Sequence, residues 1–244
     1  GELAGADEAR AINGLKLQTV NACIQVLPSL HGKALFTVED LKTQCAGKAA
    51  CTGKPAAQAL HPVQQAMVEC HGSQCGFCTP GIVMSLWSSY ELHQQQSTQP
   101  TRQQLADDLS GNLCRCTGYR PILDAGQKMF DLPAVRLDTA PVIQALQGLQ
   151  RGEATFEYAA VRDGRTDRFF APRTLDELAA LLEAKPQARI LAGSTDIGLW
   201  VSKQFRDLGD IIYVGDVAEM QAVEERPDAE GGELYIGAGA SLEA

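Results

Sequence analysis

The sequence predicts an α+β protein of several domains, in which a helical domain carrying cysteines is followed by a domain of alternating helices and strands. Three observations indicate this organisation: four cysteines in two close pairs, helical periodicity around both pairs, and a later strand–turn–helix segment rich in glycine. The chain has 244 residues, 45% of them hydrophobic, which is enough for several packed cores.

Composition restricts the classes of partner. The formal net charge of −9 argues against binding to nucleic acid or to an anionic membrane surface, because both would repel the chain. No apolar run approaches the ~18 residues that a membrane-spanning helix needs. Eight cysteines are too few for a disulfide scaffold, so a reducing compartment, the cytoplasm, is expected. Small molecules and protein subunits are therefore the expected partners.

The cysteine pairs are Cys75/Cys78, spaced Cys-x2-Cys, and Cys114/Cys116, spaced Cys-x-Cys. A helical hairpin between them can bring the four thiols together as a metal site. The unequal spacing favours a [2Fe–2S] cluster, in which each pair binds one iron, over zinc, whose sites more often repeat Cys-x2-Cys. Zinc and buried or disulfide-paired cysteines stay open as alternatives. Small residues and prolines after each pair predict tight turns whose N–H groups point at the metal site.

Four helices are expected around these pairs, over residues 60–131. Periodic apolar residues predict the first from Pro62 to Gly72 and the second from Ile82 to Tyr90. Thr101 and Gln104 form a capping box at the start of the third, and the fourth begins near Pro121.

The regions on either side of the helical domain are less regular. Residues 1–41 predict two edge strands, Leu17–Leu27 and Gly32–Val38. Residues 42–59 have the composition of a flexible insertion, in which Cys45 and Cys51 are not expected to be ligands. Residues 132–167 are expected to be a connector with one helix, Val142–Leu149.

A new domain is expected from residue 168 onward. Thr174 and Glu177 predict a second capping box before a leucine-rich helix. A short buried strand, Ala188–Ala192, then leads through a small-residue turn into a helix. Such a turn presents N–H groups to an anion such as pyrophosphate, although many turns of this kind only connect elements.

The cysteine segments also carry a resemblance. Gln-Cys-Gly-Phe-Cys-Thr-Pro-Gly at residues 74–81 and Gly-Asn-Leu-Cys-Arg-Cys-Thr-Gly-Tyr-Arg-Pro-Ile at residues 111–122 resemble the helical [2Fe–2S] domain of the molybdenum hydroxylases. This family includes xanthine dehydrogenase, aldehyde oxidase and carbon monoxide dehydrogenase. The resemblance implies that Cys75, Cys78, Cys114 and Cys116 hold the cluster nearest the molybdenum cofactor, and that Gln74 and Cys116 touch its pterin.

Cys23, in Val-Asn-Ala-Cys, resembles the fourth ligand of a second [2Fe–2S] cluster in a plant-type ferredoxin domain. In the family the other three ligands lie upstream, and this sequence has no cysteine before Cys23. The chain alone cannot build that cluster, and an incomplete chain is expected. Cys23 is then a stranded ligand or a small hydrophobic residue.

The later domain resembles the start of the FAD-binding domain of the same family, through Phe-Ala-Pro-Arg-Thr-Leu at residues 170–175 and Ile-Leu-Ala-Gly-Ser-Thr-Asp at residues 190–196. The resemblance implies that one loop lies along the FAD pyrophosphate and that Gly237 begins a second segment facing the flavin. The loop consists of Leu191, Ala192, Gly193, Ser194, Thr195, Asp196 and Ile197.

Together these resemblances imply the small iron–sulfur and FAD subunit of a bacterial enzyme of the xanthine dehydrogenase type. The implied domains are a ferredoxin-like remnant (1–41), the insertion (42–59), the helical cluster domain (60–131), the connector (132–167) and the start of the FAD domain (168–244). A large partner subunit with the molybdenum cofactor would oxidise xanthine or hypoxanthine to urate, and electrons would pass through the clusters to FAD and NAD+. The expected assembly is a heterotetramer or larger.

Three alternatives stay open at this point. The partner could act on an aldehyde or an N-heterocycle. The four cysteines could bind zinc in a binding module without catalytic function. The chain could also belong to a reductase that holds FAD alone.

Overall fold

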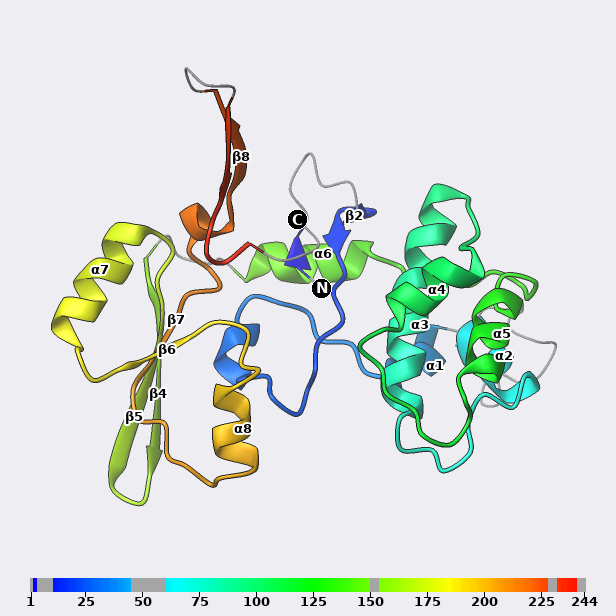
Figure 1. The fold of residues 1–244 in the computed structure, drawn as a ribbon, viewed down its shortest axis with the longest axis horizontal. Coiled ribbons are helices and arrows are strands. Elements are labelled where there is room, and N and C mark those ends of the chain that lie inside the picture. Colours follow the sequence, from blue (N-terminus) through cyan, green and yellow to red (C-terminus); the bar gives the residue numbers. More distant parts are fainter. Residues whose placement is uncertain (1, 4–10, 45–59, 150–153, 228–231, 241–244) are drawn as a thin grey trace. The chain divides into compact units, whose positions relative to one another are not determined.

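The computed structural model describes residues 2–3, 11–44, 60–149, 154–227 and 232–240. The chain forms two compact units (Figure 1). The first contains residues 1–19 and 32–150, and the second contains residues 20–31 and 151–244. The region expected to form a single N-terminal domain, residues 1–41, is therefore divided between the two units.

The first unit begins with a small antiparallel sheet of strand order β1-β3-β2. Its strands are β1 (Glu2–Leu3), β2 (Ala11–Ile12) and β3 (Leu15–Lys16). Asn13 and Gly14 connect β2 to β3 with φ angles of 46° and 86°, the left-handed conformation that a two-residue hairpin turn requires. Leu15 is fully buried and joins the core of the helices.

The prediction of two strands at Leu17–Leu27 and Gly32–Val38 is wrong. Residues 17–38, all described, contain only the short 3-10 helix η1 (Leu27–Leu30), and α1 (Asp40–Gln44) follows. The apolar side chains of this region serve two different cores. Phe36 and Val38 pack against the helices of the first unit, whereas Val26 packs in the second unit, so the segment does not present one continuous face to a partner strand.

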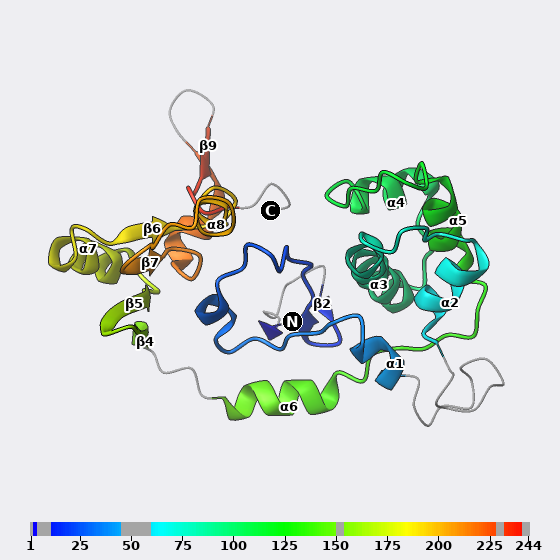
Figure 2. The ribbon, with the colours of Figure 1, turned by 90° about the horizontal axis from the view of Figure 1, so that it is seen from below.

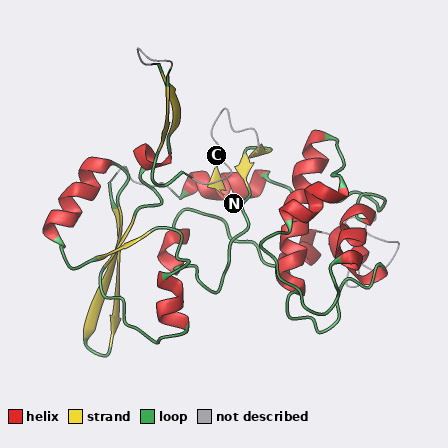
Figure 3. Cartoon of the chain, in the orientation of Figure 1, coloured by secondary structure: helices red, strands yellow, loops and turns green. Residues whose placement is uncertain are grey.

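The four expected helices are confirmed (Figure 2; red in Figure 3). They are α2 (Pro62–Glu69), α3 (Thr79–Gln96), α4 (Arg102–Asp108) and α5 (Arg120–Lys128). The capping box of Thr101 and Gln104 is present at α4. Leu86, Leu105 and Ile122 are at most 1% exposed, and each such burial contributes about 1.5–3 kcal/mol. Gly126 lets α5 pack closely against α4, because a Cβ at this position would lie 3.0 Å from the Leu105 side chain.

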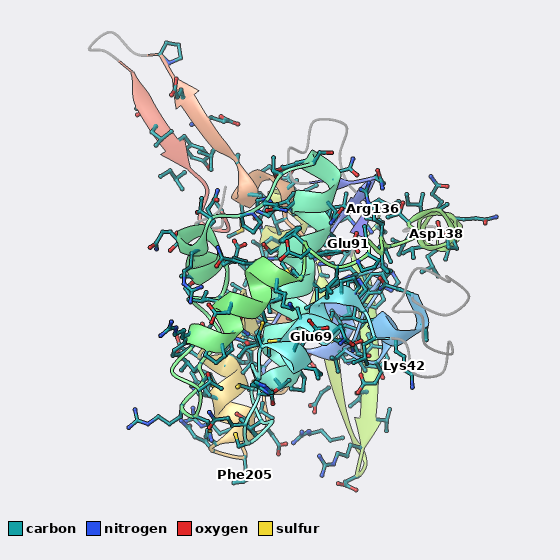
Figure 4. The ribbon with its side chains drawn as sticks, turned by 90° about the vertical axis from the view of Figure 1, so that its right-hand side faces the viewer. Lys42, Glu69, Glu91, Arg136, Asp138 and Phe205 are labelled. Carbon is teal, nitrogen blue, oxygen red and sulfur yellow. The ribbon has the colours of Figure 1, made fainter. Side chains whose placement is uncertain are left out.

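Helix α3 also fixes the segment that leaves the helical core. The Tyr90 hydroxyl accepts a hydrogen bond from the Val135 N–H at 3.1 Å, and the buried Glu91 carboxylate accepts one from the Leu137 N–H at 3.1 Å. Glu91 is labelled in Figure 4. The segment then enters α6 (Ala140–Gly148), the helix expected within the connector. None of the described helices has the length and apolar character needed to cross a membrane.

The second unit is built on a mixed sheet of order β4-β5-β7-β6, in which only the β4–β5 pair is antiparallel. Its strands are β4 (Phe156–Arg162), β5 (Arg165–Ala171), β6 (Arg189–Leu191) and β7 (Ile211–Tyr213). Phe169 and Phe170 point to opposite faces. Phe170 packs with Leu178 of α7 (Leu175–Ala184), whereas Phe169 packs with Leu191 and Ile211 on the other face.

The second unit also contains a short helix, a 3-10 helix and a hairpin. They are α8 (Ile197–Ser202), the 3-10 helix η3 (Ala218–Gln221), and the hairpin of β8 (Val223–Arg226) and β9 (Glu233–Ile236). Only half of the expected capping box at α7 is present. Thr174 accepts the Glu177 N–H, but the Glu177 carboxylate accepts the N–H of Arg173, at 2.7 Å.

The expected connector, residues 132–167, is corrected at its end. Residues 156–167 form β4, the turn after it and the first three residues of β5, which belong to a hairpin of the second unit. The turn residues Asp163 and Gly164 have φ angles of 51° and 78°. Asp-Gly is a strong hairpin signal, and it was available in the sequence.

Candidate metal and flavin sites

Two loops carry the four thiols of the first unit. The first cysteine loop, residues 70–78, joins α2 to α3 and turns sharply at Gly76, whose φ is +85°. The second cysteine loop, residues 109–119, joins α4 to α5 and turns at Gly118, whose φ is +67°. The loops meet beside the first turn of α3, where a Cβ on Gly81 would lie 3.4 Å from the Asn112 side-chain nitrogen.

The thiols form two pairs, each with one member from each loop. Cys75 lies within hydrogen-bond reach of Cys116, and Cys78 lies within reach of Cys114. Cys114 is buried, whereas Cys75 and Cys116 are exposed. The structure therefore brings the four predicted residues together, but it pairs them across the two loops and not within each motif.

The environment favours loss of protons from one thiol of each pair. Hydrogen bonding to the Thr117 side chain and backbone lowers the pKa of Cys114 to about 7, while burial and the Cys114 contact raise the pKa of Cys78 to about 11. The Phe77 backbone and Cys116 lower the pKa of Cys75. Thiolates, and not thiols, are the metal ligands, so the lowered pKa values favour the ligand form at Cys114 and Cys75.

Hydrogen bonds hold the second cysteine loop in this shape. The Tyr119 hydroxyl accepts the Cys114 N–H at 2.9 Å, and the Thr117 hydroxyl accepts the Tyr119 N–H at 3.1 Å while lying 3.1 Å from the Cys114 sulfur. Tyr119 itself has a left-handed φ of 66°, which lets the chain turn directly into α5.

The arrangement suits two metal ions better than one. Two adjacent sulfur pairs match a two-iron cluster, in which each iron takes two thiolates. A tetrahedral zinc ion would require all four sulfurs at about 2.3 Å from one centre.

We expect Thr117→Val to raise the pKa of Cys114 from about 7 toward its ordinary value near 9, because valine cannot donate a hydrogen bond to the thiolate. The check is the pH profile of iodoacetamide alkylation at Cys114 in the metal-free chain, followed by mass spectrometry. Thr117→Ser keeps the hydroxyl and should keep the low pKa. An unchanged profile in Thr117→Val would contradict the assigned cause.

The candidate flavin loop, residues 191–197, joins β6 to α8 in the second unit. Leu191 is 1% exposed at its start, and Ser194 is buried with a left-handed φ of 62°. Gly193 is exposed, and a Cβ there would meet no protein atom within 4 Å. The loop therefore has open space at its glycine, as a backbone that approaches a pyrophosphate requires.

Gly237 has a packing role that accounts for the glycine by itself. A Cβ on Gly237 would overlap the Met220 carbonyl oxygen, and the Gly237 N–H donates to Ala222 at 2.8 Å. The residue is buried against η3. Its expected contact with the flavin stays a prediction.

The other predicted site residues are placed as follows. Gln74 is exposed beside Cys75. Cys23 is exposed and belongs to the second unit, while the four paired thiols belong to the first. Its expected role as a ligand of a second cluster stays a prediction. Cys45 and Cys51 lie outside the described residues.

Sequence reasoning missed two exposed apolar side chains at the tips of the cysteine loops. Phe77, between the first pair, is 95% exposed, and Leu113, before the second pair, is 82% exposed. Their exposure could have been predicted from their position beside the cysteines, because an apolar residue at the tip of a tight loop rarely reaches the core.

Two family models match the chain, one in each part. Residues 37–127 match the [2Fe-2S] binding domain, and residues 162–244 match the FAD binding domain in molybdopterin dehydrogenase. These matches contain the four paired cysteines and the candidate flavin loop, respectively.

Similar proteins are oxidoreductases. The chain is 32% identical to xanthine dehydrogenase of Drosophila subobscura and 31% identical to aldehyde oxidase 2 of Mus musculus; these alignments cover 91% and 92% of the chain. The chain spans only 18% of the length of each. Quinoline 2-oxidoreductase from Pseudomonas putida 86 is a similar solved structure, at 28% identity and a TM-score of 0.29, covering 46% of this chain and 52% of that one.

The two domain matches occur in the same order along the chain as the two candidate sites. The chain therefore contains a [2Fe–2S] binding domain followed by an FAD binding domain of the molybdopterin dehydrogenase type, and it is homologous to the xanthine dehydrogenases and aldehyde oxidases.

Proposed function

We propose that the chain is the electron-transfer part of a molybdenum hydroxylase of the xanthine dehydrogenase type. Cys75, Cys78, Cys114 and Cys116 hold a [2Fe–2S] cluster, and the loop 191–197 holds the FAD pyrophosphate. When bound, these cofactors supply the electron-transfer chemistry, and the protein supplies position and electrostatic environment. The observation that carries the proposal is the convergence of four thiols from two distant loops into two adjacent pairs.

The residues of the chain have distinct tasks in this proposal. Thr117 donates a hydrogen bond to the Cys114 sulfur, and Tyr119 fixes the Cys114 backbone. The N–H of Phe77 bonds to the Cys75 sulfur, which lowers its pKa and stabilises the thiolate. The open space at Gly193 admits the phosphates, and Gly237 begins a second segment near the flavin.

We further propose that the tips of the cysteine loops face a subunit or domain that binds the molybdenum cofactor. The exposed side chains of Phe77 and Leu113 give the tips of both cysteine loops an apolar surface. A partner covering these side chains would exclude water from the cluster and place Gln74 and Cys116 against the cofactor. Cytoplasmic location, NAD+ as the acceptor and a heterotetramer or larger assembly belong to the same proposal.

The substrate is tested in the complex with the molybdenum-binding partner. If the partner oxidises xanthine or hypoxanthine, anaerobic addition of xanthine bleaches the visible absorption of the cluster and the flavin within a turnover, and an aldehyde or quinoline does so far more slowly. Faster bleaching by an aldehyde would instead support an aldehyde oxidase, as the similar identities to both groups of relatives allow.

We expect Phe77→Ser combined with Leu113→Ser to weaken association with the molybdenum-binding partner by about tenfold or more, because central apolar residues dominate interface energies. The dissociation constant can be measured by analytical ultracentrifugation or calorimetry. Val68→Ser is the control, since Val68 is 59% exposed in the same unit but lies on α2. Equal affinities for wild type and the double variant would exclude the loop tips as the docking surface.

A further inference from the structure

The segment Val20–His31 is part of the second unit, although it lies between stretches of the first in the sequence. Val26 packs in the apolar cluster of Phe169, Leu191 and Ile211, on the sheet face opposite α7. The His31 ring stacks on Phe156 with ring centroids 3.9 Å apart and planes inclined by 8°. The segment, drawn in blue in Figure 1, therefore covers a sheet face that α7 leaves open.

Gly198 makes the closest contact with this segment. It is buried in α8, and a Cβ on it would lie 2.7 Å from the Cβ of Ile24, 2.8 Å from its Cγ2 and 3.2 Å from its Cα. These atoms are near or in the backbone, so they cannot move aside as the end of a flexible side chain would. Only glycine allows the helix and the segment to approach this closely.

The segment Val20–His31 makes contacts next to both ends of the candidate flavin loop. Leu191, the first loop residue, is in the apolar cluster that Val26 packs against, and Ile197, the last, packs against the same cluster. Gly198 follows Ile197 directly, and its N–H donates to the Ser194 carbonyl within the loop at 2.8 Å. A displacement of the segment would therefore reach both ends of the loop.

We propose that Val20–His31 is a support for the flavin loop and that Gly198 is the positioning residue that holds it there. Ile24 and Val26 press the segment onto α8 and the sheet, and this fixes the ends of the loop in the shape that binds FAD. The inference rests on the proposed role of loop 191–197 in binding FAD. It assigns no direct contact with the cofactor to Gly198 or to the segment.

The test is a double-mutant cycle in the full chain with Gly198→Ala and Ile24→Gly. Hydrogen exchange measured by mass spectrometry should become about tenfold faster in residues 20–31 and 191–197 of Gly198→Ala, while α7 keeps its protection. FAD affinity should fall about tenfold in the same variant. When Ile24→Gly is already present, adding Gly198→Ala should change both quantities far less, because the clashing side chain is gone.

The His31 ring gives a second readout that general destabilisation would not mimic. Stacking on Phe156 should shift its imidazole proton signals upfield, and Gly198→Ala should move them toward unstacked values. Leu199→Ala, at an exposed position of α8, is the control and should leave these signals unchanged.

Separate outcomes address the two proposals. The support role is wrong if Gly198→Ala speeds hydrogen exchange in residues 20–31 but leaves the exchange of loop 191–197 and the FAD affinity unchanged. It is also wrong if Gly198→Ala has the same effect in the Ile24→Gly background as in the wild type. If the wild-type chain binds no FAD while the loop still responds to Gly198→Ala, the flavin assignment fails and the mechanical link between segment and loop stands.

Discussion

Cys114→Ser should remove the [2Fe–2S] cluster, lowering iron and sulfide content by more than about tenfold and bleaching the visible spectrum. Loss of a residue that only hydrogen-bonds to a metal ligand lowers metal affinity by about 10–100-fold, and loss of the ligand itself lowers it further. Cys114 is also the buried member of the four, so its replacement leaves a polar group against the helical core. The melting temperature of the helical unit should fall as well, because metal binding contributes to folding.

Cys70→Ser is the matched control for this experiment. Cys70 caps the end of α2 in the first cysteine loop, beside Cys75 and Cys78, but burial is the first cause of its raised pKa, and it belongs to neither thiol pair. Its substitution should leave iron content and absorption unchanged. A bleached Cys70→Ser protein, or a Cys114→Ser protein that keeps its spectrum, would show that the ligand set is wrong.

Gly193→Val should weaken FAD binding by about tenfold or more, equivalent to ~1.4 kcal/mol, with little loss of stability. The stability should persist because a Cβ at Gly193 meets no protein atom within 4 Å. The affinity should fall because the branched side chain fills the space through which the backbone approaches the phosphates. Titration of flavin fluorescence measures the affinity, and thermal unfolding measures the stability.

Gly148→Val provides the comparison. Gly148 lies at the end of α6, and a Cβ there also has no protein atom within 4 Å. This variant should bind FAD as the wild type does. If Gly193→Val bound FAD with unchanged affinity, the pyrophosphate would not lie along this loop.

The parts of the structure that depend on local sequence could be predicted. The helices around the thiols follow from apolar periodicity and from caps such as Thr101 with Gln104. The thiols could be grouped because close pairs at the ends of a helical hairpin have few other arrangements. The strand–turn–helix of residues 189–202 was also readable, because β6 is bounded by a glycine-containing turn.

The parts that depend on tertiary packing could not be predicted. Nothing local to Ile24 or Val26 indicates that this segment packs on a sheet formed by residues far along the chain. The pairing of Cys75 with Cys116 across the loops likewise depends on how the two hairpin ends meet. Short β7, only three residues long, has too little periodicity to distinguish it from a loop.

The number and kind of metal ions on the four thiols distinguish a [2Fe–2S] cluster from a single zinc ion. Both can be determined by iron, zinc and acid-labile sulfide analysis of the purified chain, together with electron paramagnetic resonance after reduction by dithionite. We predict two irons and two sulfides per chain, as a [2Fe-2S] domain requires, a brown oxidised protein and a spin-half signal on reduction. A colourless protein with one zinc per chain and no sulfide would show that the four thiols bind zinc and that no [2Fe–2S] cluster is present.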